Sequence, residues 1–314
     1  MIKINKIWIK INKIFFLCLF LSVHFSIHIY SEYLVNYYYK HRIKIIHGWK
    51  RSYNESNLLT FEDKLNWLAI HDVTKLKGKC SDKILLHEYS KRILKKDICN
   101  KILKIYENPY QINLKELPDQ FVLKTNHGSG FNVIVSNRTK FDLNSAIYKL
   151  SEWLKIDYGK QGAEYHYSFI NYFIKTINNY YLIKRKVFAE EYIGASLNNY
   201  KFFCYDSKPI FVYLSKKVGN NKYRTFFDMN WNRLDFDCIT QSDPMNNYSK
   251  PKRFELMKKY ARKLSHPFKF ARIDLYEYKD MVRLGEITFV PMNSYFLCKK
   301  NEHNIELGKY IKIF

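Results

Sequence analysis

One stretch of this chain combines residue types and a spacing that suit phosphate binding. In 121–130 an apolar run ends at Lys124 and is followed by Gly128 and Gly130. Glycine permits positive φ and close approach of the backbone to an anion, and the lysine supplies a cation. The following run, 131–135, alternates and is rich in β-formers, which predicts a hairpin lid. A strand-to-helix P-loop is not indicated, because its Gly-Lys-Ser/Thr ending is absent.

Three polar side chains of this loop, those of Asn126, His127 and Ser129, are candidates to donate hydrogen bonds to a phosphate group. The alternative for the whole segment is a simple glycine hairpin turn without a ligand. The loop therefore indicates nucleotide chemistry only in combination with the acidic residues further along the chain.

Two carboxylates, Asp274 and Glu286, each interrupt an apolar run of β type. A buried carboxylate costs several kcal/mol unless a cation or a metal neutralises it, and Mg²⁺ prefers such hard oxygen ligands. For both side chains to share one face, the hairpin between their strands needs an odd number of loop residues, for example 277–281. The alternative without a metal is an ion pair between Asp274 and Arg272 or Lys269.

Composition indicates a packed, strongly basic protein. The chain has 314 residues, 47% of them hydrophobic and 18% aromatic, which is typical of a folded chain. Lys and Arg number 53 against 29 Asp and Glu, a net charge of +24. Such a charge attracts polyanions, but the lysines are scattered along the whole length, which favours a solvated surface. A nucleic-acid or membrane-binding module remains a hypothesis that rests on charge alone, without a recognition motif.

The cysteines show no pattern of a metal or disulfide scaffold. They stand without any Cys-x-x-Cys or regular spacing, at positions 18, 80, 99, 204, 238 and 298. Neither a zinc ribbon nor a dense disulfide framework is predicted, and a reducing compartment fits.

The N-terminal 50 residues form a basic and apolar segment of their own. Ile14–Tyr30 is strongly apolar and follows several lysines, which is typical of a signal or anchor segment. Basic residues also follow it, so charge gives no orientation. We expect a membrane-associated or interfacial helix; the alternatives are a segment that packs on the protein or mistranslated upstream sequence.

Residues 55–314 are expected to form the catalytic unit. Helical spacing of apolar residues predicts helices from Phe61, with Thr60 as N-cap, and at 83–94, 98–106, 142–154 and 253–264. The runs 186–193, 200–205 and 209–214 predict one antiparallel sheet, 270–276 and 281–289 predict a strand pair, and 165–183 is expected to be an insertion.

A set of motifs resembles, in order, the TupA-like branch of the ATP-grasp family over roughly residues 55 to 310. The segments that carry the resemblance are 117–130, 188–193, 200–205, 226–231, 272–276 and 286–289. The resemblance implies an α+β ATP-grasp fold, in which two α+β lobes with antiparallel sheets clamp a nucleotide. It also implies ATP and Mg²⁺ as cofactors and a role in cell-surface polysaccharide or teichuronopeptide synthesis.

The resemblance assigns nucleotide contacts to four residues. Lys124 matches the lysine at the α-phosphate and adenine edge, and Lys201 matches the basic residue facing the outer phosphates. Glu190 and Glu191 match the hinge strand that brackets adenine and reaches the ribose. Because strand neighbours face opposite sides, one glutamate must point away, and we expect Glu191 to make the contact. The alternatives are lysines on a basic surface and a charged pair on an edge strand.

The resemblance also assigns the metal and the catalytic cations. Asp274 and Glu286 match the metal ligands, and Thr288 stands where many ATP-grasp enzymes have an asparagine ligand. Lys201 and Arg272 are the candidate catalytic residues.

Two positions depart from the pattern: Asn199 replaces an expected aspartate, and 291–295 replaces a glycine-containing loop. Both departures touch the geometry expected around the phosphates or the acceptor. Arg224, Asp228 and Trp231 are candidates to face the acceptor, with core or turn roles as the alternative.

The leading hypothesis is an ATP- and Mg-dependent ligase that joins the carboxylate of a small molecule or glycopolymer to an amine through an acyl phosphate. The alternative is a glycosyltransferase that holds a nucleotide sugar through metal at Asp235-Phe-Asp237. No specific nucleic-acid partner is expected. The expected location is the cytoplasm, at the inner face of the membrane if residues 1–30 make peripheral contact with it.

Overall fold

The computed structural model describes residues 56–72, 74–156, 183–194, 197–218, 220–240, 242–243, 248–294 and 296–314. The N-terminal segment 1–50 and nearly all of the predicted insertion lie outside these residues. None of the described helices has the length and apolarity to cross a membrane.

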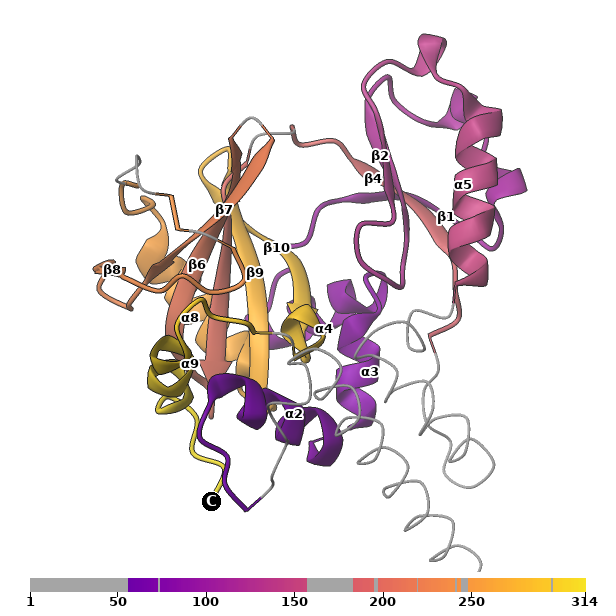
Figure 1. Cartoon of the computed structure of the whole chain (residues 1–314). Coiled ribbons are helices and arrows are strands. Elements are labelled where there is room, and N and C mark those ends of the chain that lie inside the picture. The colour runs from indigo at the N-terminus through magenta and orange to yellow at the C-terminus, as the bar shows by residue number, and fades with distance from the viewer. Residues whose placement is uncertain are drawn as a thin grey trace, which may run out of the picture.

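The described chain contains α-helices, short 3₁₀ turns and ten strands of two sheets (Figure 1). The α-helices are α2 (Phe61–His71), α3 (Lys75–Ser81), α4 (Leu85–Leu94), α5 (Leu143–Lys155), α8 (Phe254–Ser265) and α9 (Asn301–Gly308). The 3₁₀ turns are η1 (Pro109–Gln111), η2 (Leu114–Glu116), η3 (Arg138–Lys140) and η4 (Pro291–Ser294).

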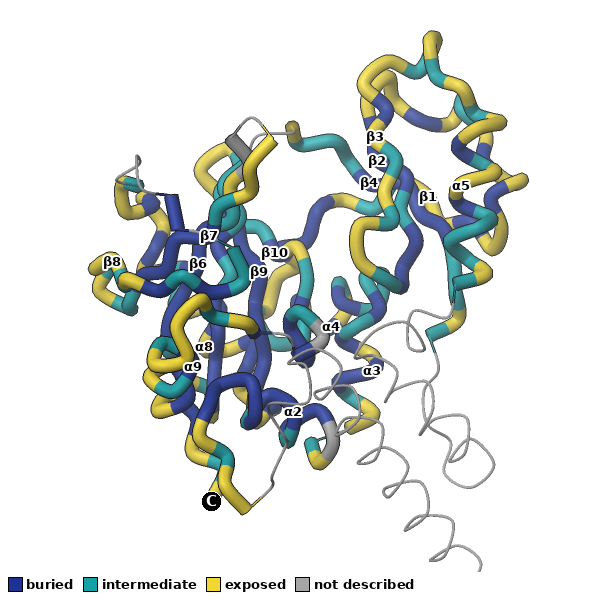
Figure 2. The backbone as a smooth tube through the Cα atoms, in the orientation of Figure 1, coloured by how far each residue is buried: buried dark blue, intermediate teal, exposed yellow. Residues whose placement is uncertain are grey.

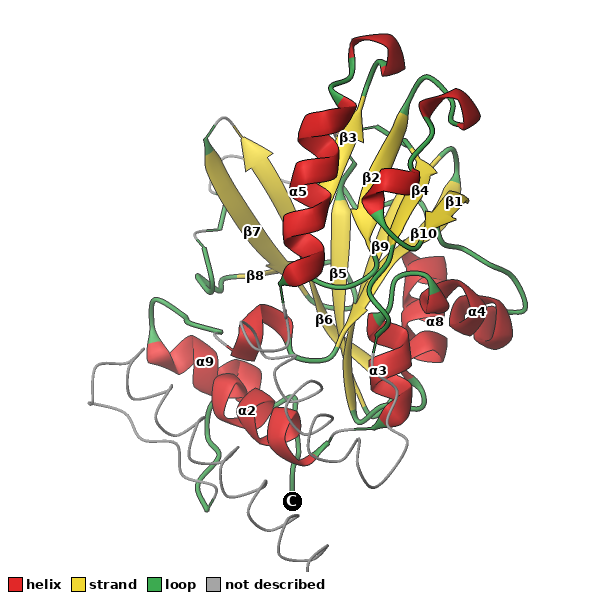
Figure 3. Cartoon of the chain, turned by 90° about the vertical axis from the view of Figure 1, so that its right-hand side faces the viewer, coloured by secondary structure: helices red, strands yellow, loops and turns green. Residues whose placement is uncertain are grey.

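A small antiparallel sheet carries the glycine loop. Its strands are β1 (Ile102–Tyr106), β2 (Phe121–Thr125), β3 (Asn132–Val135) and β4 (Val187–Glu191), in the order β1-β4-β2-β3. Helix α5 covers one face, where Phe121, Leu123 and Leu150 are fully buried. Figure 3 shows α5 lying across one face of this sheet. Because side chains alternate along a strand, Val122, Lys124 and Glu190 are left on the other face.

A large antiparallel sheet carries the acidic pair. Its strands are β5 (Asn199–Tyr205), β6 (Lys208–Val218), β7 (Asn221–Phe227), β8 (Arg233–Leu234), β9 (Phe270–Tyr278) and β10 (Met281–Thr288). They follow the order β10-β9-β5-β6-β7-β8, and the central strands are the most buried part of the molecule (Figure 2). The fold is therefore α+β with two antiparallel sheets, as the sequence predicted.

The two faces of the large sheet are covered by different helices. One face packs Phe202 and Ile273 against Met257 and Leu264 of α8. The other packs the rings of Phe203, Phe211 and Phe226 against Phe61 of α2 and Leu307 of α9. Further along this second face the side chains change from aromatic to charged, and there Lys201 and Asp274 lie opposite each other in the register.

The helices with strong caps begin where the sequence predicted. Thr60 and Asp63 form a capping box at α2, and the side chain of Asp142 accepts from Ser145 N at α5. The helix expected at 98–106 is wrong, because Ile102–Tyr106 forms β1 and pairs with β4. The expected single sheet of 186–193, 200–205 and 209–214 is also wrong, since β4 belongs to the small sheet and β5 and β6 to the large one.

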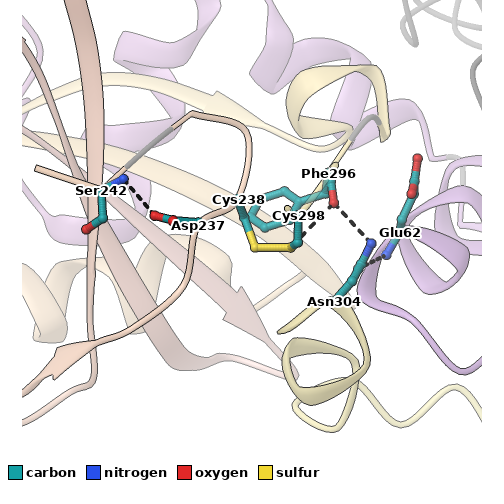
Figure 4. Close-up of a disulfide and its surroundings, with 7 residues drawn as sticks. All are labelled: Glu62, Asp237, Cys238, Ser242, Phe296, Cys298 and Asn304. Carbon is teal, nitrogen blue, oxygen red and sulfur yellow. Dashed lines mark hydrogen bonds between the residues drawn. A yellow bond between two sulfur atoms is a disulfide. The ribbon is translucent and has the colours of Figure 1, made fainter. Parts of the chain in front are cut away.

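A disulfide joins Cys238 to Cys298 across 60 residues of sequence (Figure 4). The backbone flanks it on both sides with hydrogen bonds, Ile239 N to Leu297 O at 2.6 Å and Lys299 N to Asp237 O at 2.8 Å. The residue spacing gave no indication of this pair, because the two cysteines meet only after the intervening sheet strands are in place. Three other cysteines of the described chain are free and buried.

Candidate nucleotide and metal site

Asp274 and Glu286 are direct partners on β9 and β10. The expected odd-numbered loop is wrong: residue 278 pairs with 281, so the turn holds two residues, Lys279 and Asp280, both with positive φ. A β-bulge at Gly285 then shifts the register by one residue and brings Glu286 opposite Asp274. The bulge therefore supplies the change of face that the loop was expected to supply.

The guanidinium of Arg272 holds this cluster together. Its Nε donates to Asp274 Oδ1 at 2.7 Å, and its Nη2 donates to Asp274 Oδ2 at 2.8 Å. The same Nη2 donates to Glu286 Oε1 at 2.7 Å and to Thr288 Oγ1 at 3.0 Å. Lys201 adds a contact from Nζ to Asp274 Oδ2. All five residues proposed for catalysis and metal binding are thus in one place.

Burial and charge set the protonation states in this cluster. Burial by itself would lower the pKa of Arg272, but the adjacent Asp274 carboxylate outweighs it and the pKa is raised. Burial by itself would raise the pKa of Glu286, but Lys201, Arg272 and Lys83 outweigh it and hold the pKa far below its usual value. Glu286 is therefore ionised at neutral pH, beside a permanently charged guanidinium.

The alternative of an ion pair is realised by Arg272, not by Lys269, which pairs with Asp206. This pairing does not exclude a metal, because the two carboxylates differ in exposure. The side chain of Asp274 is 1% exposed and both of its oxygens are bonded, whereas that of Glu286 is 32% exposed. Glu286 is the carboxylate more accessible to a metal.

Lys124 and Glu190 link the small sheet to the large one. Lys124 Nζ contacts Glu190 Oε1 at 2.6 Å, and Asn100 Nδ2 donates to the same oxygen at 2.9 Å. Asn100 Oδ1 in turn accepts from the hydroxyl of Tyr276 on β9 at 2.6 Å. Both lysine and glutamate therefore lie on the face of the small sheet that connects to β9.

Glu191, which we expected to contact the nucleotide, lies on the opposite face of its strand. Its Oε1 accepts from Lys101 N at 3.0 Å and lies 3.8 Å from Nη2 of Arg283. One of the two glutamates does face away, as predicted, but the one beside Lys124 is Glu190. The geometry favours Glu190 over Glu191 as the acidic residue that acts together with Lys124.

The glycine loop has the backbone geometry that the sequence predicted. Gly128 and Gly130 adopt φ of 77° and 76°, and β2 and β3 pair as a hairpin. Lys83, in the turn before α4, donates from Nζ to Gly128 O at 2.5 Å. The same lysine helps to lower the pKa of Glu286. Lys83 therefore binds the loop and acts electrostatically on Glu286, a role that its lysine-rich surroundings in the sequence did not indicate.

The side-chain amide of Asn126 has no N–H donor left for a phosphate. Its Nδ2 donates to Asp82 Oδ2 at 2.8 Å and to Lys184 O at 3.0 Å, and its Oδ1 accepts from Lys186 N at 2.8 Å. Asn126 is buried, and these bonds fasten the loop to its neighbours. The predicted phosphate contact of this side chain is therefore corrected to a structural role, whereas Ser129 is exposed and keeps its prediction.

His127 points away from the predicted phosphate site. Its Nε2 lies 3.2 Å from Trp153 O and 3.3 Å from Ile156 O, at the end of α5, and its ring meets Phe131 edge-on. Burial, helped by Arg185, lowers the pKa of His127 to about 4. The imidazole is therefore neutral at pH 7 and anchors the loop to the helix, which corrects its predicted role as a phosphate donor.

Acid should weaken the fold through His127. The unfolded chain binds a proton near pH 6.5, but the folded chain resists protonation down to about pH 4. The stabilisation is complete above pH 6.5, and about 2–3 kcal/mol is lost as the pH falls to about 4. Urea unfolding at both ends of this range should show a flatter pH dependence for His127→Gln than for the wild type. The exposed-site control His266→Gln should keep the wild-type slope, and equal slopes for all three proteins would contradict the assignment.

Two of the three acceptor candidates have structural roles. Asp228 Oδ1 accepts from the backbone N–H groups of Asn230 and Asn232, which closes a turn. Trp231 stacks on Phe227, with ring centroids 4.1 Å apart. Arg224 remains the only one of the three that neither a turn nor core packing accounts for.

The motif Asp235-Phe-Asp237 does not form a carboxylate pair of the kind that the glycosyltransferase alternative needs. Asp235 is exposed, and Asp237 Oδ1 accepts from Ser242 N at 3.0 Å beside the disulfide (Figure 4).

The fold and the site define an ATP-grasp protein: two antiparallel sheets, a glycine hairpin with its lysine, and an Arg-x-Asp strand paired with a glutamate. The family model described as TupA-like ATPgrasp matches residues 63–312. The chain belongs to this family, as the sequence motifs predicted. No curated protein matches the sequence.

Several solved structures are similar to the chain in part of their length. D-alanine–D-alanine ligase from Bacillus anthracis is 18% identical, with a TM-score of 0.41 and coverage of 68% of this chain and 58% of that one. The same enzyme from Helicobacter pylori is 13% identical, with a TM-score of 0.41 and coverage of 75% and 59%. Carboxyaminoimidazole ribonucleotide synthase from Aspergillus clavatus, complexed with ATP, is 10% identical, with a TM-score of 0.38. The match covers 71% of this chain and 46% of that one. The chain spans less than two thirds of the length of these three proteins.

Proposed function

We propose that the protein is an ATP- and Mg²⁺-dependent ligase that joins a carboxylate to an amine. Family membership supports ATP as the nucleotide, and the cluster at Asp274 and Glu286 supports phosphoryl transfer. The observation that carries the proposal is the convergence of Lys201, Arg272 and the two carboxylates on one face of the large sheet. Charge that develops on a phosphoryl group requires such cations close by.

In the proposed reaction a carboxylate oxygen of the substrate attacks the γ-phosphorus of ATP. The bond from the β,γ-bridging oxygen to that phosphorus breaks, which gives an acyl phosphate and ADP. The amine then attacks the acyl carbon, phosphate leaves, and the amine loses a proton to the surroundings. Lys201 and Arg272 would bind the outer phosphates, and Lys124 with Glu190 would position the nucleotide from the small sheet.

The residues present fit a magnesium ion. The donor set is made only of oxygens, and three of them already converge on one positively charged nitrogen, Arg272 Nη2. Glu286 and Asp274 would hold the ion, with Thr288 as a weaker oxygen donor beside them. When bound, the ion would neutralise charge on the phosphates.

The setting and partners are part of the same proposal. Membership of the TupA-like family supports a role in cell-surface polysaccharide synthesis, with a small-molecule or glycopolymer carboxylate and an amine acceptor as substrates. Action at the inner face of the membrane depends on residues 1–30, which lie outside the described residues and remain a prediction.

Thermal unfolding with Mg-ATP tests the nucleotide and metal assignment. A ligand at about 100 times its Kd stabilises a protein by about 2.7 kcal/mol, which raises the Tm of a chain of this size by roughly 4 °C. The wild type should show this rise only when Mg²⁺ and ATP are present together. Glu286→Gln should lose most of this rise, because the substitution removes a carboxylate that is proposed to hold the ion. The variant should still fold, since the Glu286 side chain is partly exposed and Arg272 keeps Asp274 as its partner.

The matched control is Asp280→Asn, which removes one exposed carboxylate from the turn of the same hairpin. This variant should keep the full wild-type rise. Equal rises in all three proteins, or a rise that does not need Mg²⁺, would reject the metal assignment. If the metal assignment holds, candidate carboxylates are added to the enzyme with Mg-ATP, and the carboxylate on which ADP release depends is the substrate.

A further inference from the structure

Arg224 is a buried cation that has no anionic partner among the described residues. It lies on β7, and the residue is only 6% exposed. Its Nε is buried without a hydrogen bond, and no hydrogen bond or ion pair of its guanidinium is found within the described chain. Within the described chain, the guanidinium lies over the ring of Tyr213, whose centroid is 5.9 Å from Cζ. Nothing in the described fold therefore neutralises this charge.

The register places Arg224 on the same face of the large sheet as the acidic pair. Arg224 is opposite Ser215, and Ser215 is opposite Asn199, which precedes Lys201 by two residues on its strand. Residues directly opposite each other, and residues two apart on a strand, share a face. The amide oxygen of Asn199 is also buried without a hydrogen bond. An uncharged side chain stands here where the family pattern led us to expect an aspartate.

Positive charge exceeds negative charge in this region. Lys222 is exposed, but partial desolvation lowers its pKa, and so do the neighbouring cations Arg224, Lys201 and Arg272. The two carboxylates of the region, Asp274 and Glu286, are already bonded to Arg272. Arg224 and Lys222 thus carry two charges for which the nearby acids provide no compensation.

An unpaired buried charge is costly, and a cation–π contact returns only about 0.5–2 kcal/mol. An anionic group of a bound ligand would neutralise the guanidinium charge of Arg224. A guanidinium presents several N–H donors in one plane, which match two oxygens of a carboxylate or phosphate. We propose that Arg224, with Lys222, forms a binding site for an oxyanion of the bound substrates.

This inference rests on the proposed function, because it places the site next to the ligase centre. Two sources can supply the oxyanion: the terminal phosphate of ATP, or the carboxylate of the substrate that becomes phosphorylated. The shared chemistry is a group with two or more oxygens and a negative charge. Arg224 belongs to the substrate-binding part of the site rather than to the metal cluster.

The test compares wild type, Arg224→Met and Lys216→Met by thermal unfolding. Lys216 lies on the neighbouring strand β6, opposite Tyr223, and is exposed, so it controls for the loss of one positive charge. The probes are sodium phosphate and sodium malonate, each measured against sodium chloride at equal ionic strength. Both anions should raise the Tm of wild type and Lys216→Met, and Arg224→Met should show less than half of that rise.

The Tm without any anion gives a second readout. Arg224→Met should unfold at the wild-type temperature or above it, because the substitution removes an unpaired buried charge. If Arg224→Met keeps the full rise in Tm with both anions, the proposal is overturned, whatever the Tm of this variant without an anion. Arg224→Lys, which keeps the charge but not the paired donors, should show an intermediate rise and provides a folded variant if the methionine variant fails to fold.

Two further arms identify the source of the oxyanion. If the difference between wild type and Arg224→Met appears with Mg-ATP but not with Mg-ADP, the site binds the terminal phosphate. If it appears with Mg-ADP plus malonate, the site binds the substrate carboxylate. The simple-anion arm uses no nucleotide, so its failure is distinguishable from a failure of Glu286→Gln to lose the Mg-ATP response.

Discussion

Asp274→Asn should destabilise the protein by about 3–5 kcal/mol and abolish the response to Mg-ATP. The substitution removes the buried carboxylate that both Arg272 and Lys201 contact. Breaking a buried ion pair by removing one partner leaves an uncompensated charge, and this accounts for the large loss of stability. The free energy of unfolding, measured in urea, should fall by this amount, whereas Asp280→Asn should change it by no more than about 0.5 kcal/mol.

A double variant separates the role in stability from the role in function. Arg272→Met/Asp274→Leu removes both buried charges, and apolar replacements of a buried pair are often neutral or stabilising. It should recover most of the stability lost in Asp274→Asn while the Mg-ATP response stays absent. An Asp274→Asn protein within about 1 kcal/mol of the wild type would show that Asp274 does not balance Arg272.

The features that the sequence predicted well are those determined by neighbouring residues. Gly128 and Gly130 need no distant partner to adopt positive φ, and the cap of α5 depends on Asp142 and Ser145 alone. The strand pair that carries Asp274 and Glu286 was predicted because each carboxylate interrupts an apolar run of β type. In each case the physical cause lies within one segment.

The features that the sequence did not predict depend on contacts between segments. Ile102–Tyr106 has the apolar content of a helix or a strand, and pairing with β4 decides between the two. The bulge at Gly285 becomes visible only when β9 lies beside β10. Lys83 is one lysine among many, and its position is fixed by the bond to Gly128 O, 45 residues away.

The same distinction explains the corrected site residues. Asn126 and His127 have side chains that suit a phosphate, but their partners come from Asp82 and from the end of α5, which are remote in sequence. Polar side chains buried at the base of a loop form hydrogen bonds with other parts of the fold, because each buried polar group left unpaired costs about 1–3 kcal/mol. The exposed Ser129 and the backbone of the two glycines are left for a ligand.

Reduction of the Cys238–Cys298 disulfide should lower the free energy of unfolding by up to about 4 kcal/mol. The bridge closes a loop of 60 residues, and the loss of that constraint enlarges the conformational entropy of the unfolded chain. The loop contains β9 and β10, so the acidic pair lies within the closed segment. Urea unfolding with and without a reducing agent measures the effect.

The variant Cys238→Ser/Cys298→Ser provides the control for the disulfide. It should match the reduced wild type and should not respond to the reducing agent. The flanking hydrogen bonds of Ile239 and Lys299 remain in both forms, so we expect the folded structure and the Mg-ATP response to persist near neutral pH. If the wild type is equally stable with and without the reductant, the bridge does not constrain the unfolded chain, and stability in this region comes from the aromatic packing around Phe296 and Phe61.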